Sequence, residues 1–262
     1  MALFEFKLHP LEKVMAWGNT LHWFGLTDGI YYMNVGEEQL FRNSKEKLQE
    51  WKTEDPSFDT SNVFVDYQVI RLYEDLLEIL PNILQEVPLK LYALVETPQK
   101  QEKWQTHLWN IYESTESKHI EELYFQAAWL SNHQLSTMHL QHSPNIWFWR
   151  VNDEIFIRWD NRLKDNNIIQ PWSTVQGEIK MSVKDFLFEV KTFHNRLINC
   201  MTNRIELIQH NNPIPNIEID IPYLMNEHKE REKSLENTLK VKPDILDWDK
   251  VISANKELVP WF

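Results

Sequence analysis

The chain has 262 residues, a length that suits one domain or two small ones and is enough to bury a substantial core. With 39 acidic and 27 basic side chains, the formal net charge is −12, which disfavours nucleic-acid phosphates and anionic lipid as partners. The single cysteine excludes an intramolecular disulfide, and the sequence has no run of about 18 apolar residues that could span a bilayer. We therefore expect a cytoplasmic protein that binds neither nucleic acid nor membrane.

Aromatic residues are abundant and linker residues are scarce. The chain contains 12 Trp, 13 Phe and 8 Tyr but only 5 Gly, and no tract rich in Gly, Ser or Pro divides it. Aromatic side chains contribute most to stability when they are buried. The composition predicts a single domain over residues 1–262, with residues 210–262 as a potential C-terminal helical extension.

Three segments of the chain predict strands. Residues 4–8 alternate apolar and charged side chains, as in a short strand that Pro10 ends. Residues 21–35 surround Asp28-Gly29 with aromatic and β-branched side chains, and residues 145–160 surround Asn152-Asp153 in the same way. A turn-forming pair between two such runs is typical of a β-hairpin, so we expect two hairpins.

Helical spacing follows the first predicted hairpin. A short helix and a loop around Pro56 are expected within residues 44–60. Apolar residues recur every three to four positions over residues 64–80, which predicts a helix that Pro81 ends or kinks. Two further helices with polar outer faces are predicted at residues 100–112 and 118–131. Their apolar stripes are Trp104, Leu108, Ile111 and Tyr112 in the first, and Ile120, Leu123, Tyr124, Ala127 and Leu130 in the second.

In the second predicted hairpin, both faces are apolar. Pairing Val151 with Glu154 across a two-residue turn divides the side chains between two faces. One face carries Trp147, Trp149, Phe156 and Arg158, and the other carries Ile146, Phe148, Ile155, Ile157 and Trp159. Such a ribbon is either covered on both sides or leaves one aromatic face open to a ligand. Burial on both sides is the favoured prediction.

A long helix dominates the C-terminal half. Ser182 and Asp185 resemble a capping box, and an apolar stripe then continues to about residue 209, a length of about 40 Å. Residues 217–221 alternate Ile with acidic residues and predict an edge strand between Pro215 and Pro222. Helices are expected at 223–239 and from about Asp247. These elements together predict an α+β fold of antiparallel hairpins packed with several helices.

Few residues point to catalysis. Glycine-rich nucleotide loops and the GxSxG motif are absent, and Cys200 lies beside an apolar stripe, as an inert packed thiol would. His133, His139 and His142 lie in a predicted loop without the fixed spacing of a metal site, so no metal or cofactor is predicted. The sequence accordingly predicts no enzyme.

A carboxylate pair leaves an alternative open. Asp28 and Asp160 each adjoin an aromatic strand and could form an acid–base pair with His22 in a shared cleft. A turn residue and a strand end explain the same two carboxylates more simply. Arg150 and Arg158 could stack on the tryptophans of the second hairpin or hold an anionic ligand.

The chain resembles a bacterial domain family of unknown function. The resemblance lies in Trp17-Gly18, LHWFGLTDG (21–29), DYQVIRLYEDLLEILP (66–81), HSPNIWFWR (142–150), Trp159-Asp160, Pro171-Trp172 and Gly177, and continues through FLFEV with Phe193 and Met201. Ala16 stands where the family would have Pro, and the tail after Pro213 is more individual. Similar proteins are encoded beside polymorphic toxins. The resemblance therefore implies an immunity protein, or antitoxin, of an effector–immunity pair, with a toxin delivered by contact or by type VI secretion.

The distribution of charge along the sequence indicates where such a protein would bind its toxin. Residues 46–122 contain 16 acidic and 7 basic residues, a net of −9 against −3 for the rest of the chain. An acidic inhibitor would be steered towards a basic toxin, such as a nuclease. The candidate partner-binding residues are Glu54, Asp55, Asp59, Glu74, Asp75, Glu78, Glu113, Glu116, Glu121 and Glu122. The alternative is a small-molecule-binding protein or hydrolase-like enzyme with an aromatic cleft between the two predicted hairpins.

Overall fold

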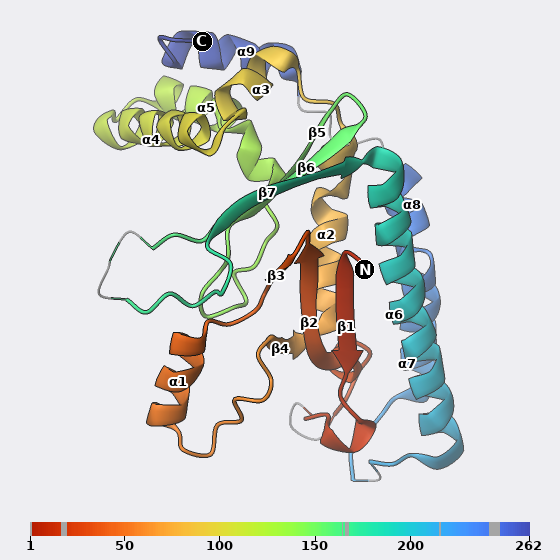
Figure 1. Ribbon diagram of the computed structural model, residues 1–262. Coiled ribbons are helices and arrows are strands. Elements are labelled where there is room, and N and C mark those ends of the chain that lie inside the picture. The colour runs from red at the N-terminus through yellow and green to blue at the C-terminus, as the bar shows by residue number, and fades with distance from the viewer. Residues whose placement is uncertain (1, 17–19, 164, 166–167, 215, 241–246) are drawn as a thin grey trace.

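The computed structural model describes residues 2–16, 20–163, 165, 168–214, 216–240 and 247–262 (Figure 1). Trp17-Gly18 and Pro215, named above, lie outside these residues. The fold is α+β, as predicted: two antiparallel sheets pack with helices, among them one long helix in the C-terminal half. None of the described helices is both long and apolar enough to cross a bilayer.

The strands are β1 (Phe4–Leu8), β2 (Asp28–Val35), β3 (Glu38–Leu40), β4 (Val65–Gln68), β5 (Ile146–Val151), β6 (Glu154–Asp160) and β7 (Gln176–Ser182). The helices are α1 (Lys45–Glu54), α2 (Val69–Leu84), α3 (Leu89–Val95), α4 (Pro98–Ser114), α5 (Lys118–Ala127), α6 (Val183–Asn211), α7 (Ile221–Glu232), α8 (Ser234–Lys240) and α9 (Trp248–Leu258). Short 3-10 turns occupy Leu11–Lys13, Gly25–Thr27 and Trp129–His133.

The N-terminal sheet corrects the first predicted hairpin. Asp28 and Gly29 do not form a turn; they begin β2, which pairs with β1, β3 and β4. The hairpin turn instead follows Val35, where Gly36 has a φ of +71°. The residues before Asp28 are not a strand. They form the 3-10 turn Gly25–Thr27, in which the side chain of Leu26 is buried in the core. The Asp-Gly pair was therefore a misleading turn signal.

The second predicted hairpin is confirmed in turn and register. Val151 pairs with Glu154, and Asn152 adopts a φ of 53°, the left-handed conformation that this short turn requires. β7 then pairs with β6 to complete a three-stranded sheet. Burial on both sides is also confirmed, because each predicted face belongs to a separate core cluster.

This central sheet divides two hydrophobic cores. The larger core contains the N-terminal sheet, α2 and the inner face of α6, together with Phe148 and Ile157 of the central sheet. The smaller core contains side chains of α3, α4, α5 and α9 packed on Trp147, Trp149 and Phe156. Figure 1 shows the same division, with α4, α5 and α9 gathered at one end of the molecule and α1 at the other.

Helix boundaries follow the predictions in part. Ser182 caps α6 by accepting a hydrogen bond of 3.0 Å from the Asp185 backbone N–H, as predicted. The helix predicted from residue 64 begins only at Val69, because residues 65–68 pair with β2 as β4. Pro81 does not end α2 but lies inside it, one turn before the last residue.

The C-terminal segment departs most from prediction. The edge strand expected at residues 217–221 is wrong: Glu218 forms an isolated bridge with Thr20, and Ile221 begins α7. Residues 223–239 hold α7 and α8 rather than one helix. α9 is confirmed, with Asp247 as its cap, and its apolar residues Val251 and Leu258 belong to the smaller core.

Candidate functional site

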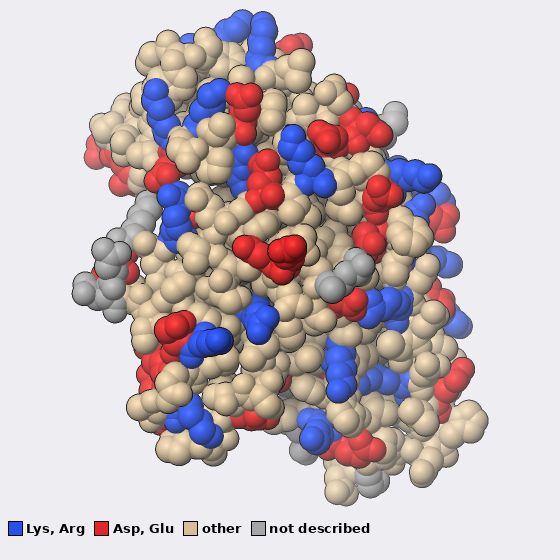
Figure 2. All heavy atoms as spheres, in the orientation of Figure 1, with Lys and Arg blue, Asp and Glu red and all other residues tan. Residues whose placement is uncertain are grey.

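The ten candidate acidic residues do not share one surface. Glu54, Asp55 and Asp59 lie at the end of α1 and in the loop after it, whereas Glu113, Glu121 and Glu122 lie on α4 and α5, with Glu116 in the loop between them, at the opposite end of the molecule (Figure 1). Glu74, Asp75 and Glu78 belong to α2. On the face shown in Figure 2, acidic and basic side chains are interspersed. These ten residues therefore do not form a single acidic face.

Asp75 is not a surface residue. It is 1% exposed and pairs with Arg71, with 2.9 Å between Oδ1 and the guanidinium. His139 Nδ1 lies 3.6 Å from Oδ2 of Asp75, and His139 Nε2 lies 3.0 Å from the Tyr31 hydroxyl. Burial outweighs the attraction of Arg71 and raises the pKa of Asp75 to about 7, and burial lowers the pKa of His139 to about 4. This carboxylate takes part in an internal network and cannot contact a partner.

Helices α4 and α5 carry an exposed aromatic cluster, which we call the aromatic face: Trp109, Tyr112, Tyr124 and Phe125. Tyr112 and Tyr124 stack with ring centroids 4.5 Å apart, and Trp109 and Phe125 flank them at 5.8 and 6.0 Å from Tyr112. Trp109 is 51% exposed and Phe125 62% exposed. Large aromatic rings left in water over such a contiguous area mark interaction surfaces.

Four exposed carboxylates lie on the two helices of the aromatic face and in the loop between them. Residues four apart lie on the same side of a helix, which places Glu113 beside Trp109 and Glu121 beside Phe125. Glu116 and Glu122 lie in the connecting loop and on α5. Burial, then the neighbouring Tyr112 and Glu113, raises the pKa of Tyr124. Glu113, Glu121 and Glu122 therefore lie within one helical turn of exposed aromatic rings.

Sequence reasoning overlooked this aromatic face. It assigned Tyr112 and Tyr124 to the buried stripes of two helices, although both are only partly buried. Trp109 and Phe125 do not belong to those apolar stripes. This position off the stripes was the sequence signal that could have identified the aromatic face. An aromatic residue off the apolar side of an amphipathic helix has no core to enter.

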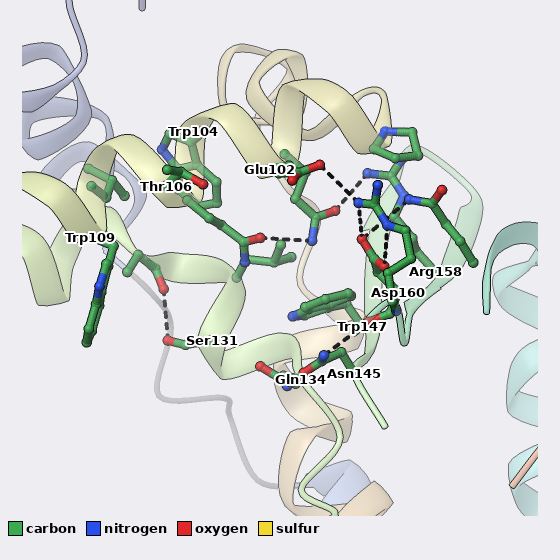
Figure 3. A pocket seen from close by; sticks show the side chains of 18 of the residues that line it. Glu102, Trp104, Thr106, Trp109, Ser131, Gln134, Asn145, Trp147, Arg158 and Asp160 are labelled. Atoms are coloured by element: carbon green, nitrogen blue, oxygen red, sulfur yellow. Dashed lines mark hydrogen bonds and ion pairs between the residues drawn. The ribbon is translucent and has the colours of Figure 1, made fainter. Parts of the chain in front are cut away.

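A cavity of about 730 Å³ adjoins the aromatic face, between α4 and the central sheet. Figure 3 shows Trp104 and Trp147 on opposite sides of it, with Trp109 at one end and Arg158 and Asp160 at the other. Six side-chain amides line it together with these indoles: Gln101, Gln105, Asn110, Gln134, Asn145 and Gln176. Its volume lies within the range of about 300–1,000 Å³ typical of small-ligand sites.

Three of the four charged side chains that line the cavity are paired with one another. Arg162 binds Asp160 at 2.6 Å and Glu102 at 2.9 Å. Burial acts to raise the pKa of Asp160, but hydrogen bonds from Arg162 outweigh it, so the pKa is lowered. Two carboxylates thus share one guanidinium, and this ion-paired group has a formal charge of −1.

Arg158 has no donor left for a ligand. Its Nε and Nη2 bind Glu178, and Nη1 donates to the Val95 carbonyl at 2.6 Å and to Gln101 Oε1 at 2.8 Å. Nη2 also donates to the Glu96 carbonyl at 3.2 Å. All five N–H groups are therefore used. The residue ties the end of α3 and the start of α4 to the central sheet, and the hypothesis that it holds an anion loses its basis.

The other arginine and the catalytic candidates also have structural surroundings. Arg158, not Arg150, stacks on Trp149, at 4.8 Å from the ring centre, and Arg150 donates to the carbonyls of Leu84 and Asn152. Asp160 lines the cavity, but Asp28 and His22 do not. Burial raises the pKa of Asp28, whose charged neighbours belong to the N-terminal sheet region and α6. The predicted acid–base set is therefore not assembled.

The predicted aromatic cleft between two hairpins also differs from what is found. The 730 Å³ cavity lies beside the second hairpin, and a smaller one of about 380 Å³ lies near α1. Neither is lined by any of residues 21–35. His133, His139 and His142 do not converge, and the described residues contain no group of three or more His, Cys, Asp or Glu side chains placed to hold a metal.

Comparison with known proteins gives a family but no function. No curated protein and no solved structure matches the chain. A family model matches residues 3–254, nearly the whole length, and its description is a family of unknown function. The chain belongs to that family, DUF5984.

Proposed function

We propose that this protein is an immunity protein that binds a basic bacterial toxin in the cytoplasm and blocks it through the aromatic face. The observation that carries the proposal is the cluster of four rings on α4 and α5, two of them more than half exposed, with exposed carboxylates one helical turn from Trp109 and Phe125. Tyr and Trp are enriched among the residues that dominate protein–protein binding energy.

Charge supports the choice of partner. Glu113, Glu116, Glu121 and Glu122, on these two helices and in the loop between them, form an acidic rim, and Lys118 is the one lysine or arginine between Glu113 and Phe125. A basic surface would meet this rim with complementary potential, which accelerates association, and would cover the rings, which slows dissociation. A typical stable interface buries about 1,600 Å² in total, so the toxin would extend beyond these eight residues.

The test is co-expression with the product of the neighbouring gene. We expect cells to survive only when this chain is present and the two proteins to co-purify. Replacing Trp109 and Phe125 together by Ala should weaken binding at least about 30-fold, because central aromatic residues each contribute about 1–2 kcal/mol or more. Glu113→Lys with Glu121→Lys should slow association and remove most of its salt dependence.

Two control variants separate this surface from general effects. Phe188 on α6 is 65% exposed, close to the 62% of Phe125, but it lies on another side of the fold. Phe188→Ala should therefore leave toxin binding unchanged. Replacing Glu54 and Asp55 by Lys adds the same charge near α1 and should have little effect. Normal survival and affinity in the folded Trp109/Phe125 variant, or no binding to the adjacent toxin, would overturn the proposal.

A further inference from the structure

We infer that the outer edge of β7 pairs with the same edge of a second copy of this chain, so that two molecules share one continuous antiparallel sheet. The edge belongs to the central sheet, whose strands lie in the order β5, β6 and β7. The aromatic face lies on α4 and α5 instead, so the inference does not depend on the proposed function. It follows from the free backbone groups of β7, from its open position and from the order of its charges.

Every second residue of β7 leaves its backbone groups unpaired. In an antiparallel ladder, alternate residues direct both N–H and C=O towards the neighbouring strand, and the residues between them direct both groups away. The Val183 N–H donates to the Asp153 carbonyl, and this pair continues the β6–β7 register, so the odd-numbered residues of β7 face β6. The outward backbone groups are those of Gln176, Glu178 and Lys180. No backbone group of the described residues pairs with them.

Two other outer edges of the sheets are covered by the chain itself. On β1, the Phe4 carbonyl accepts from Arg196 of α6. On β5, the Arg150 carbonyl accepts from the Val87 N–H. Figure 1 shows β7 in front of β5 and β6, with no helix or strand between it and the viewer, and Lys180 is exposed. The outer edge of β7 is therefore open to a further strand.

The edge of β7 also lacks the features that usually prevent strands from pairing, such as a proline, a bulge or a charged side chain over the edge. Its sequence has no proline, and its register with β6 is unbroken. The Lys180 ammonium lies 4.3 Å from the centre of the Phe156 ring, and Glu178 accepts from Arg158 at 2.8 Å. Phe156 and Arg158 belong to β6, so both charged side chains lean inward and leave the backbone edge accessible.

The order of the charges selects one register. Two copies related by a twofold axis pair residues that are equally distant from the axis. With the axis at Ile179, Glu178 lies opposite Lys180 of the second copy, and outward-facing residues meet one another, as hydrogen bonding requires. An axis at Glu178 or at Lys180 would place that residue opposite itself, and like charges directly opposite are destabilising. Ile179 is also the midpoint of β7, so this register pairs the whole strand.

Such an interface is small. The two pairs of Glu178 with Lys180 supply about four backbone hydrogen bonds across the axis. Strand pairing of this length buries less than the roughly 1,200 Å² at the lower limit of stable interfaces. We therefore expect a reversible dimer with a Kd of about 10–300 µM.

Sedimentation velocity of the full-length protein at about 5–500 µM measures this association. Lys180→Pro removes an outward N–H without breaking a bond to β6, and proline is tolerated on edge strands, so this variant should fold and remain monomeric. Lys180→Glu places a carboxylate opposite Glu178 of the second copy and should weaken association at least about tenfold. Lys191→Glu on α6 is the matched control: it makes the same change of charge at an exposed lysine away from β7 and should associate as the wild type does.

Cysteine cross-linking tests the register. Ile179 lies on the axis as a non-hydrogen-bonded pair, whose Cα atoms are about 4.5 Å apart, within the range of a disulfide. In a Cys200→Ser background, Ile179→Cys should form a cross-linked dimer on mild oxidation. Met181→Cys is the control on the same face of the strand, because the two copies of residue 181 would lie about 13 Å apart and should not cross-link.

Three results would overturn the inference. The first is a protein that stays monomeric at about 500 µM and gives no cross-link through Ile179→Cys. The second is association that persists unchanged in folded Lys180→Pro. The third is cross-linking through Met181→Cys in preference to Ile179→Cys. Since β7 is not part of the aromatic face, toxin binding by the same variants shows whether the two proposals fail separately.

Discussion

The indole Nε1 of Trp104 donates a 2.8 Å hydrogen bond to Oδ1 of Asn255, and both residues are buried. The Asn255 amide also donates to the carbonyls of Ala127 and Val251. One side chain thereby joins α4, α5 and α9. Residues of α4 and Tyr124 of α5 line the cavity, and the same two helices carry the aromatic face. The C-terminal helix consequently helps to hold the helices of both candidate surfaces in place.

We predict that Asn255→Leu lowers the free energy of unfolding by about 2–4 kcal/mol. The substitution leaves the Trp104 N–H and the Ala127 carbonyl buried without their partner, and each unsatisfied group costs about 1–3 kcal/mol. Urea denaturation measures the change. Asn226→Ala on exposed α7 is the control and should change the value by less than about 0.5 kcal/mol. A similar effect of both substitutions would contradict the role given to Asn255.

Arg158→Met should destabilise the protein by about 3–5 kcal/mol, because it leaves Glu178 and two backbone carbonyls without their buried donor. Arg158→Lys should restore little, since one ammonium cannot reach acceptors on three sides. Arg162→Met removes exposed ion pairs and should cost at most about 1 kcal/mol. Thermal unfolding compares the three variants. Equal losses for Arg158→Met and Arg162→Met would show that the network around Arg158 is not structurally special.

The stability of the protein should fall in mild acid because of His133. Burial lowers its pKa from 6.5 to about 4, so the unfolded chain takes up a proton between pH 6.5 and 4 that the folded chain does not. The stabilising contribution is complete above pH 6.5 and is lost as the pH falls through about 4. It amounts to about 3 kcal/mol at 1.36 kcal/mol per pKa unit. His133→Leu should flatten the measured dependence of unfolding free energy on pH in this window; an unchanged slope would contradict this.

Asp75 should have the opposite effect on the pH dependence of stability. Its pKa is raised from 3.8 to about 7, so between these values the folded state holds a proton that the unfolded state releases, and stability decreases as the pH rises. Asp75→Asn removes this opposing contribution. The variant should therefore gain stability more steeply than the wild type from pH 4 to 7. Glu206→Gln, an exposed carboxylate on α6 that is not among the charges acting on Asp75, should leave the profile unchanged.

Gly177→Ala should destabilise the central sheet by about 1–3 kcal/mol through overpacking. Gly177 pairs with Trp159, and a Cβ at position 177 would lie 2.2 Å from Cζ2 of that indole. Trp159→Phe removes this part of the ring. In the double variant, the total loss should be smaller than the sum of the two single losses by at least about 0.5 kcal/mol, measured by urea denaturation. If the two losses are additive, the strain caused by Gly177→Ala does not come from contact with Trp159.

Elements with a strong local signal were predicted well. The β5–β6 register follows from Asn152-Asp153 and from alternation that puts every second side chain on one face. The start of α6 follows from the Ser182 cap, whose hydrogen bond spans three residues. In both cases the interactions that select the structure lie within a few residues of one another.

Errors arose where a distant segment selects the conformation. Residues 65–68 have helical spacing, but β2 offers a strand edge and they pair with it. Asp28-Gly29 has turn chemistry, but Gly29 instead pairs with Leu8. Likewise, the acidic character of Asp75 predicted exposure, whereas its place on the inner side of α2 encloses it with Tyr31 and His139.

The sequence by itself determined the α+β class, the central hairpin and the long helix, because spacing and turn residues act over short distances. Only the tertiary structure decided which aromatic residues stay exposed and which charges are paired. Trp104 and Trp109 lie on one helix, yet one packs against Asn255 and the other faces solvent. The difference depends on α9, which comes about 140 residues later in the chain and covers only one side of α4.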